Sequence, residues 1–124
     1  MTAMVAALSD EDMRNVAAYF AAQTPAPRAA TSKETLDLGR QIWRGGIADR
    51  DIPTCAGCHG ANGAGLPAQY PRLAGQYATY TDTQLKAWRS AERANDQNRM
   101  MRAIAAKMND QEIAAVADYA AGLH

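Results

Sequence analysis

The residues best suited to chemistry in this 124-residue sequence lie within seven positions of one another. The stretch TCAGCHG, residues 54–60, holds both cysteines of the chain and one of its two histidines. Two thiols separated by two residues can form a disulfide, bind a metal or be alkylated, and imidazole is a common metal ligand. The pattern Cys55-x-x-Cys58-His59 is the sequence to which a c-type haem is attached.

The spacing explains this chemistry. Two intervening residues in a helical turn set the thiols at the separation of the two vinyl groups on one edge of a porphyrin, and the following imidazole then faces the iron. We therefore interpret Cys55 and Cys58 as the covalent tethers of one haem c and His59 as the proximal ligand of its iron.

Three other interpretations use the same residues. A thioredoxin-like dithiol expects a preceding strand in a βαβ unit, which this sequence does not indicate. A structural zinc site needs four ligands, and only Cys55, Cys58, His59 and the terminal His124 are available. A plain disulfide would not require the histidine. Haem attachment accounts for all three residues of the motif.

The two ends of the sequence resemble each other. Residues 1–22 align without gaps on residues 101–122. Identical pairs include Met1/Met101, Asp10/Asp110, Val16/Val116 and Tyr19/Tyr119. Two similar alanine-rich helices would explain this, but a duplicated domain, of which only the end of the first copy is present, explains it better. We therefore predict an orphan helix over 1–22, a Pro/Ala linker over 23–31 and a haem-binding domain over 32–124.

The repeat also bears on the second axial ligand of the iron. The candidates are Met100, Met101, Met108, His124 and water. Met101 lies eight positions before Asn109, as Met1 lies eight before Ser9, whereas Met100 has no counterpart in the first copy. Met108 matches Leu8 and suits a core position, and His124 is at the solvated end. The register favours Met101.

The elements that must position these residues are predicted to be helices. Ser9 with Asp12, and Asn109 with Glu112, have the spacing of capping boxes. A helix over 33–44 is capped by Ser32, ends at Gly45-Gly46 and presents Leu36, Gly39, Ile42 and Trp43 on one face. Tyr119 is the expected partner of Gly39 and Trp43, and another helix over 77–92 turns Leu85 and Trp88 inward. No segment predicts a strand, so the domain is expected to be all-α.

Composition excludes several classes of partner. Thirteen basic residues balance thirteen acidic ones, so no excess charge points to nucleic acid or anionic lipid. No apolar run approaches the length of a membrane span. The first residues, MTAMVAALSDED, lack the features of a secretory signal, although haem is attached to such motifs outside the cytoplasm. We therefore expect a mature or truncated chain.

At this point the sequence resembles a class I cytochrome c, and more closely the carboxy-terminal half of a di-haem cytochrome c4. The resemblance is carried by RGG, CAGCHGANGAG, YPRLAGQ, QLKAWR and MRAIAAKMNDQEIAAVADYAAGLH, and it covers 32–124 almost without interruption. It implies the class I fold around one covalent haem, with an extra N-terminal helix. The sequence departs from the full pattern because a first Cys-x-x-Cys-His is absent, so Met1 has no iron of its own here.

The resemblance also implies roles for further residues. In class I cytochromes c a proline about twelve residues after the ligating histidine lends its carbonyl to the outer imidazole nitrogen, and Pro71 is at that distance from His59. Gln76, Tyr80 and Trp88 fall where residues near the propionates or the porphyrin edge would lie. Helix capping by Gln76 and ordinary core packing by Trp88 are the alternatives.

The function implied is that of a periplasmic or membrane-associated bacterial electron carrier that passes electrons toward a terminal oxidase, and not of an enzyme. Its partners would be a terminal oxidase, a quinol–cytochrome c reductase or a dehydrogenase, and residues 1–22 would either fold back on 32–124 or self-associate. One alternative is a haem subunit of a periplasmic oxidoreductase complex. Another is a haem enzyme or sensor in which Met101 is labile and a ligand enters.

Overall fold

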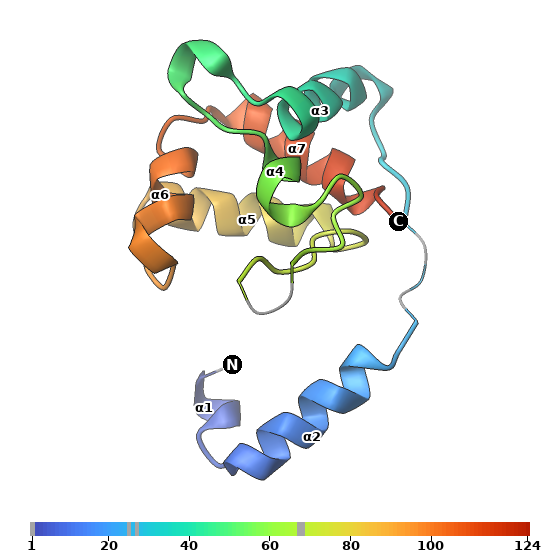
Figure 1. Cartoon of the computed structure of the whole chain (residues 1–124), viewed down its shortest axis with the longest axis vertical. Coiled ribbons are helices and arrows are strands. Elements are labelled where there is room, and N and C mark those ends of the chain that lie inside the picture. The colour runs from blue at the N-terminus through green and yellow to red at the C-terminus, as the bar shows by residue number, and fades with distance from the viewer. Residues whose placement is uncertain (1, 25, 27, 67–68) are drawn as a thin grey trace.

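The computed structural model of the chain describes residues 2–24, 26, 28–66 and 69–124, so Met1 and the linker prolines 25 and 27 lie outside the described residues (Figure 1). The described elements are α1 Thr2–Val5, α2 Asp10–Ala21, α3 Lys33–Gly45, η1 Ala48–Arg50, α4 Cys55–His59, α5 Ala78–Arg89, η2 Gln97–Arg99, α6 Met100–Ala105 and α7 Asp110–Ala121. Within these residues there are two isolated β-bridges and no strand, which confirms the all-α prediction.

Helices α3 and α7 form the main contact of the domain (Figure 1). Gly39 allows the close approach, because a Cβ at that position would lie 2.7 Å from the Cβ of Tyr119 and would clash with the carbonyl oxygen of Ala115. The rings of Trp43 and Tyr119 lie with centroids 6.3 Å apart. The predicted partnership of Gly39, Trp43 and Tyr119 is therefore confirmed. Leu36, predicted on the same buried face, is instead 37% exposed, and Leu38 packs against the core.

Side chains at the helix ends explain where the elements begin and stop. Ser32 caps α3, and Asn109 forms a reciprocal capping box with Glu112 at the start of α7. Gly46 ends α3 with a φ of 67°. Helix α5 ends at Arg89, earlier than predicted, because the chain adopts a left-handed conformation at Ala91.

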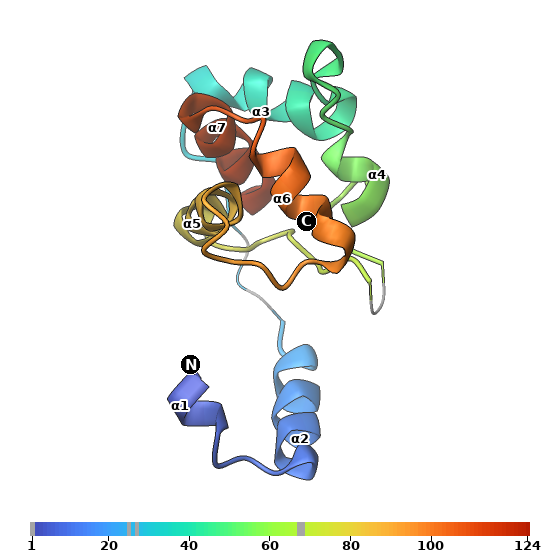
Figure 2. The same ribbon diagram turned by 90° about the vertical axis from the view of Figure 1, so that its left-hand side faces the viewer.

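The core fills the space between α3, α5, α6 and α7. Its buried members are Ile42, Trp43, Ile52, Leu85, Ala105, Met108, Ile113, Val116, Tyr119 and Ala120. The half-buried side chains of Cys55, Trp88 and Met101 pack against this core. Figure 2 shows α6 between α5 and α4, so the segment that carries Met101 lies near the segment that carries His59.

Residues 2–21 repeat the arrangement of residues 100–121 without the core. Both consist of a short helix, a turn and a twelve-residue helix with a capping box. No residue of α2 is buried, and Tyr19 is 63% exposed where the equivalent Tyr119 is 9% exposed. Figures 1 and 2 show α1 and α2 apart from the domain, so the expected fold-back onto 32–124 is not observed in the described residues.

The linker is fastened at its domain end. The carboxylate of Asp118 accepts hydrogen bonds from the backbone N–H groups of Thr31 and Ser32 and from the Thr31 hydroxyl, at 2.8 to 3.1 Å. The guanidinium of Arg28 lies 3.5 Å from the ring centroid of Tyr77 and donates to the carbonyl of Gly75. Among the described residues, no helix is long and apolar enough to cross a membrane.

Candidate cofactor site

Helix α4 is a single turn that holds all three residues of the Cys-x-x-Cys-His motif. Thr54 starts it, because its hydroxyl accepts a hydrogen bond from the N–H of Gly57 at 3.1 Å. Gly60 ends it with a φ of 84°, a conformation that glycine adopts without strain. The local sequence therefore forms one helical turn with the histidine at its last position.

The ring of His59 is buried and held in one orientation. It is 7% exposed, and its Nδ1 lies 2.8 Å from the carbonyl oxygen of Pro71. A carbonyl can only accept, so Nδ1 carries the proton and Nε2 keeps the lone pair that can ligate a metal. The hydrogen bond expected between Pro71 and His59 is present, and it gives the histidine the tautomer that a ligand requires.

The loop over 60–76 is folded so that the Pro71 carbonyl reaches the ring. The carbonyl of Gly63 accepts from the N–H groups of Leu73 and Ala74, at 2.9 and 3.0 Å. The indole of Trp43 donates to the carbonyl of Ala61 at 3.1 Å. The sequence placed Trp43 only in the α3–α7 contact, and its second role as an anchor of the loop was not predicted. A buried indole needs an acceptor, which was the available signal.

The two cysteines are unsuited to the competing chemistries. Burial raises the pKa of Cys55 to about 11. A redox-active dithiol or a zinc ligand needs the thiolate, whose formation this environment disfavours. Among the described residues, no cluster of three or more histidine, cysteine or acidic side chains could hold a metal ion. The thioredoxin-like and zinc interpretations therefore lack structural support.

Met101 lies on the inner face of α6. It lies one turn before the buried Ala105, at the spacing that stacks side chains on one side of a helix. Met101 itself packs against the core. Met100 is also half-buried and lies one turn before Ile104, but it is not among the described residues that pack against the core.

Trp88 has an unsatisfied donor. Its Nε1 is buried without a hydrogen-bond partner among the described residues, while the guanidinium of Arg93 lies 4.1 Å from its ring centroid. A buried N–H without an acceptor costs about 1–3 kcal/mol, so an acceptor from a bound group would suit it. The free Nε2 of His59, the neighbouring thiols, the inward Met101 and this orphaned donor together fit a haem.

For the two other predicted residues, Gln76 and Tyr80, no contact observed among the described residues indicates a position at the haem site. The side-chain oxygen of Gln76 accepts a hydrogen bond from the N–H of Tyr77 at 2.8 Å, but α5 starts without a side-chain capping bond, so the capping alternative is not supported. Tyr80 is 50% exposed. A role for either residue near the haem stays a prediction.

Comparisons with known proteins agree with this chemistry. Residues 38–123 match the family model of cytochrome c. The whole chain is 44% identical to part of cytochrome c4 of Azotobacter vinelandii, covering 60% of that protein. It is also 44% identical, over 99% of its length, to the thiosulfate dehydrogenase electron acceptor of Stutzerimonas stutzeri strain A1501, covering 58% of that protein.

A solved structure gives the same result. The crystal structure of reduced recombinant cytochrome c4 from Pseudomonas stutzeri has a TM-score of 0.95 and 40% identity, with 100% of this chain and 66% of that chain covered. The chain spans 60 to 65% of the length of the cytochrome c4 relatives, and it aligns with their C-terminal half. The chain belongs to the cytochrome c family, and its Cys55-x-x-Cys58-His59 motif binds one covalent haem c.

Proposed function

We propose that the chain is an electron carrier that holds one electron on a haem c whose iron is ligated by His59 and Met101. The haem supplies reversible one-electron oxidation and reduction of its iron. The protein would hold the iron through the oriented imidazole of His59 on α4 and the thioether of Met101 on α6, and these two protein ligands would leave no site for a substrate on the iron. The observation that carries the proposal is the hydrogen bond from His59 Nδ1 to the Pro71 carbonyl, which leaves only Nε2 for a metal.

Two adjacent methionines allow a matched test of the sixth ligand. Purified haem-loaded Met101→Ala should lose the weak red absorption band that ferric haem shows when methionine is bound. Its ferrous form should bind carbon monoxide, and its reduction potential should fall, because the thioether favours ferrous iron. Met100→Ala should keep the band. Loss of the band in Met100→Ala alone, or a wild-type protein without it, would contradict the proposal.

The relatives support two cellular settings. In the first, which the likeness to cytochrome c4 supports, the chain is a free carrier in the bacterial periplasm, with a terminal oxidase or a quinol–cytochrome c reductase as its proposed partner. A haem subunit that serves an oxidoreductase follows from the likeness to the thiosulfate dehydrogenase electron acceptor and to the thiosulfate dehydrogenase of Marichromatium purpuratum. Size-exclusion chromatography of native material separates the two, since only the second elutes as a stable complex.

The N-terminal segment is proposed to be the end of a preceding cytochrome domain. Its two helices match α6 and α7 in order and in capping, and its apolar side chains have no partner among the described residues. In this proposal α2 normally covers the core of another haem domain, as α7 covers this one. When that domain is missing, the same face would support self-association.

A further inference from the structure

The turn that leads into α6 contains two consecutive residues in an unfavourable conformation. Asn98 and Arg99 have φ values of 52° and 58°. A left-handed conformation costs about 1–2 kcal/mol for a residue with a side chain, so two in succession persist only if the surroundings hold them. Both immediately precede Met100 and Met101. The position of the proposed methionine ligand therefore depends on what holds this turn.

Asp96 spans the two strained residues. One of its carboxylate oxygens accepts from the backbone N–H of Arg102 at 3.0 Å, and the other accepts from the Nε of the same arginine at 2.6 Å. The carboxylate side chain is only 4% exposed. The side chain of Asp96 thus connects the start of the turn to Arg102 in the first turn of α6. Met101 lies between these two residues in the sequence.

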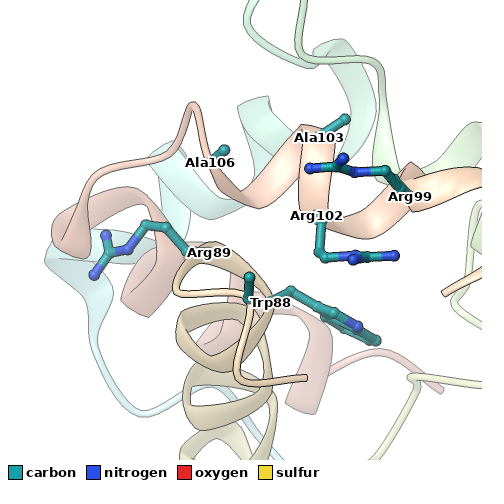
Figure 3. A pocket seen from close by; sticks show the side chains of 7 residues that line it. Trp88, Arg89, Arg99, Arg102, Ala103 and Ala106 are labelled. Atoms are coloured by element: carbon teal, nitrogen blue, oxygen red, sulfur yellow. The ribbon is translucent and has the colours of Figure 1, made fainter. Parts of the chain in front are cut away.

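Arg102 also borders a groove beside α5. Arg102 and Trp88 line this groove between the end of α5 and the outer face of α6, which has a volume of about 430 Å³ (Figure 3). Figure 3 shows the Arg102 side chain above the Trp88 ring. The guanidinium of Arg93, over the Trp88 ring, donates to Gln84 at 2.7 Å. The contact that holds Arg102 is therefore the one with Asp96.

The carboxylate is charged when it makes these contacts. Burial alone would raise the pKa of Asp96, but the hydrogen bonds from the N–H and the guanidinium of Arg102 outweigh it and leave the pKa below its ordinary value. Charge-assisted hydrogen bonds are about twice as strong as neutral ones. The contact is thus built to resist opening at neutral pH.

We propose that Asp96 is a positioning residue for the sixth haem ligand, acting through Arg102 to hold Met101 against the iron. The inference depends on the proposed ligation by Met101. When the Asp96–Arg102 contact opens, the turn can relax out of its left-handed conformation and carry the thioether away. The free energy of methionine ligation would then depend in part on the Asp96–Arg102 ion pair, which contacts neither the iron nor the sulfur.

The test compares two Asp→Asn variants of the haem-loaded protein. Asp96→Asn removes the charge at the turn. The matched control is Asp110→Asn, which removes the ion pair between Asp110 and Arg89, and the side chain of Asp110 is 73% exposed. The expected result for Asp96→Asn is about a tenfold rise in the rate at which the ferrous form captures carbon monoxide, because roughly one charged hydrogen bond is weakened. Its red ferric band should also bleach well below the temperature of global unfolding. Asp110→Asn should change neither.

Each outcome decides the inference. Arg102→Gln keeps the backbone N–H bond but removes the guanidinium, so it serves as the second variant if Asp96→Asn does not accumulate. An unchanged capture rate and an unchanged band in the surviving variant overturn the inference while leaving the proposed function intact. A fall in melting temperature with the band bleaching only on unfolding shows a merely structural role and also overturns it. A wild-type protein without the band overturns the ligation itself.

Discussion

At the scale of single residues, Glu112 of α7 shows how this small domain accommodates a buried charge. Glu112 is buried, and its oxygens are assigned separately: one pairs with the guanidinium of Arg50, and the other accepts from the N–H of Asn109 at 2.9 Å. The hydrogen bond from Arg50 lowers the pKa of Glu112 below its ordinary value, against the opposing effect of burial. The charged form is therefore the stabilising one.

This charge predicts an acid dependence of stability. Because the pKa of Glu112 is lower in the folded state than in the unfolded one, its contribution is fully present above the ordinary value of 4.5 and is lost as the pH falls through the folded value. Glu112→Gln should cost about 1–3 kcal/mol of unfolding free energy at pH 7 and much less at pH 3. Thermal melts of both proteins across this range test it, and a pH-independent difference would contradict it.

At the scale of elements, the contact of α3 with α7 brings together the loop and the helix on which the site depends. Gly39 lies under Tyr119, one turn before Trp43, whose indole holds the loop at Ala61. The same helix contains a second glycine, Gly45, around which a Cβ would meet no atom within 4 Å. In α3, close packing therefore requires glycine at Gly39 but not at Gly45.

These two glycines make a matched pair. Gly39→Ala should destabilise the domain by about 1–3 kcal/mol, because the added Cβ overlaps the Ala115 carbonyl and forces α7 outward. Gly45→Ala should be neutral or stabilising by about 0.5–1 kcal/mol, because alanine is the better helix former. Denaturant unfolding monitored by circular dichroism compares them. If both substitutions changed the free energy of unfolding equally, the close approach of α7 at Gly39 would not be what determines stability here.

The sequence predicts a helix boundary or a contact between helices only when a local residue pattern causes it. The spacing of Gly39 and Trp43 predicts the α3–α7 contact, and the capping residues predict the start of α7. The early end of α5 is not predictable in this way, because Ala91 in a left-handed conformation has no sequence signal. The contact of Asp96 with Arg102 was also missed, since it follows from a turn conformation that neither residue type specifies.

The residues of the candidate site also differ in whether a local sequence pattern predicts them. Cys55, Cys58 and His59 are recognisable because one helical turn fixes their geometry, and the repeat register selects Met101. Pro71 was found only through resemblance to a family, because a carbonyl twelve residues away carries no side-chain signature. The unsatisfied indole nitrogen of Trp88 is a property of three-dimensional burial, which composition cannot show.

At the scale of the whole molecule, two related helices differ in burial. Helix α7 buries nine of its twelve residues against the domain, whereas no residue of α2 is buried among the described residues. Val16 and Tyr19 repeat Val116 and Tyr119, although Arg14, Asn15 and Phe20 stand where α7 has alanines. Asp118 holds the linker at Thr31 and Ser32, so α2 extends from a fixed point of the domain.

The exposed face of α2 should make the 124-residue chain self-associate. Phe20 is 67% exposed and lies beside Val16 on one face, and Arg14 lies on the opposite face, at the position equivalent to the exposed Ala114. Phe20→Glu should shift sedimentation toward the monomer, because a charge on the apolar face disfavours its burial, and Arg14→Glu should leave the distribution unchanged. The haem spectrum should be the same in both variants, since no residue of α2 is buried against the haem domain in the part of the chain that the structure describes. If the unmodified chain stays monomeric at high concentration, α2 is not adhesive on its own, and its face would need the specific surface of a preceding haem domain.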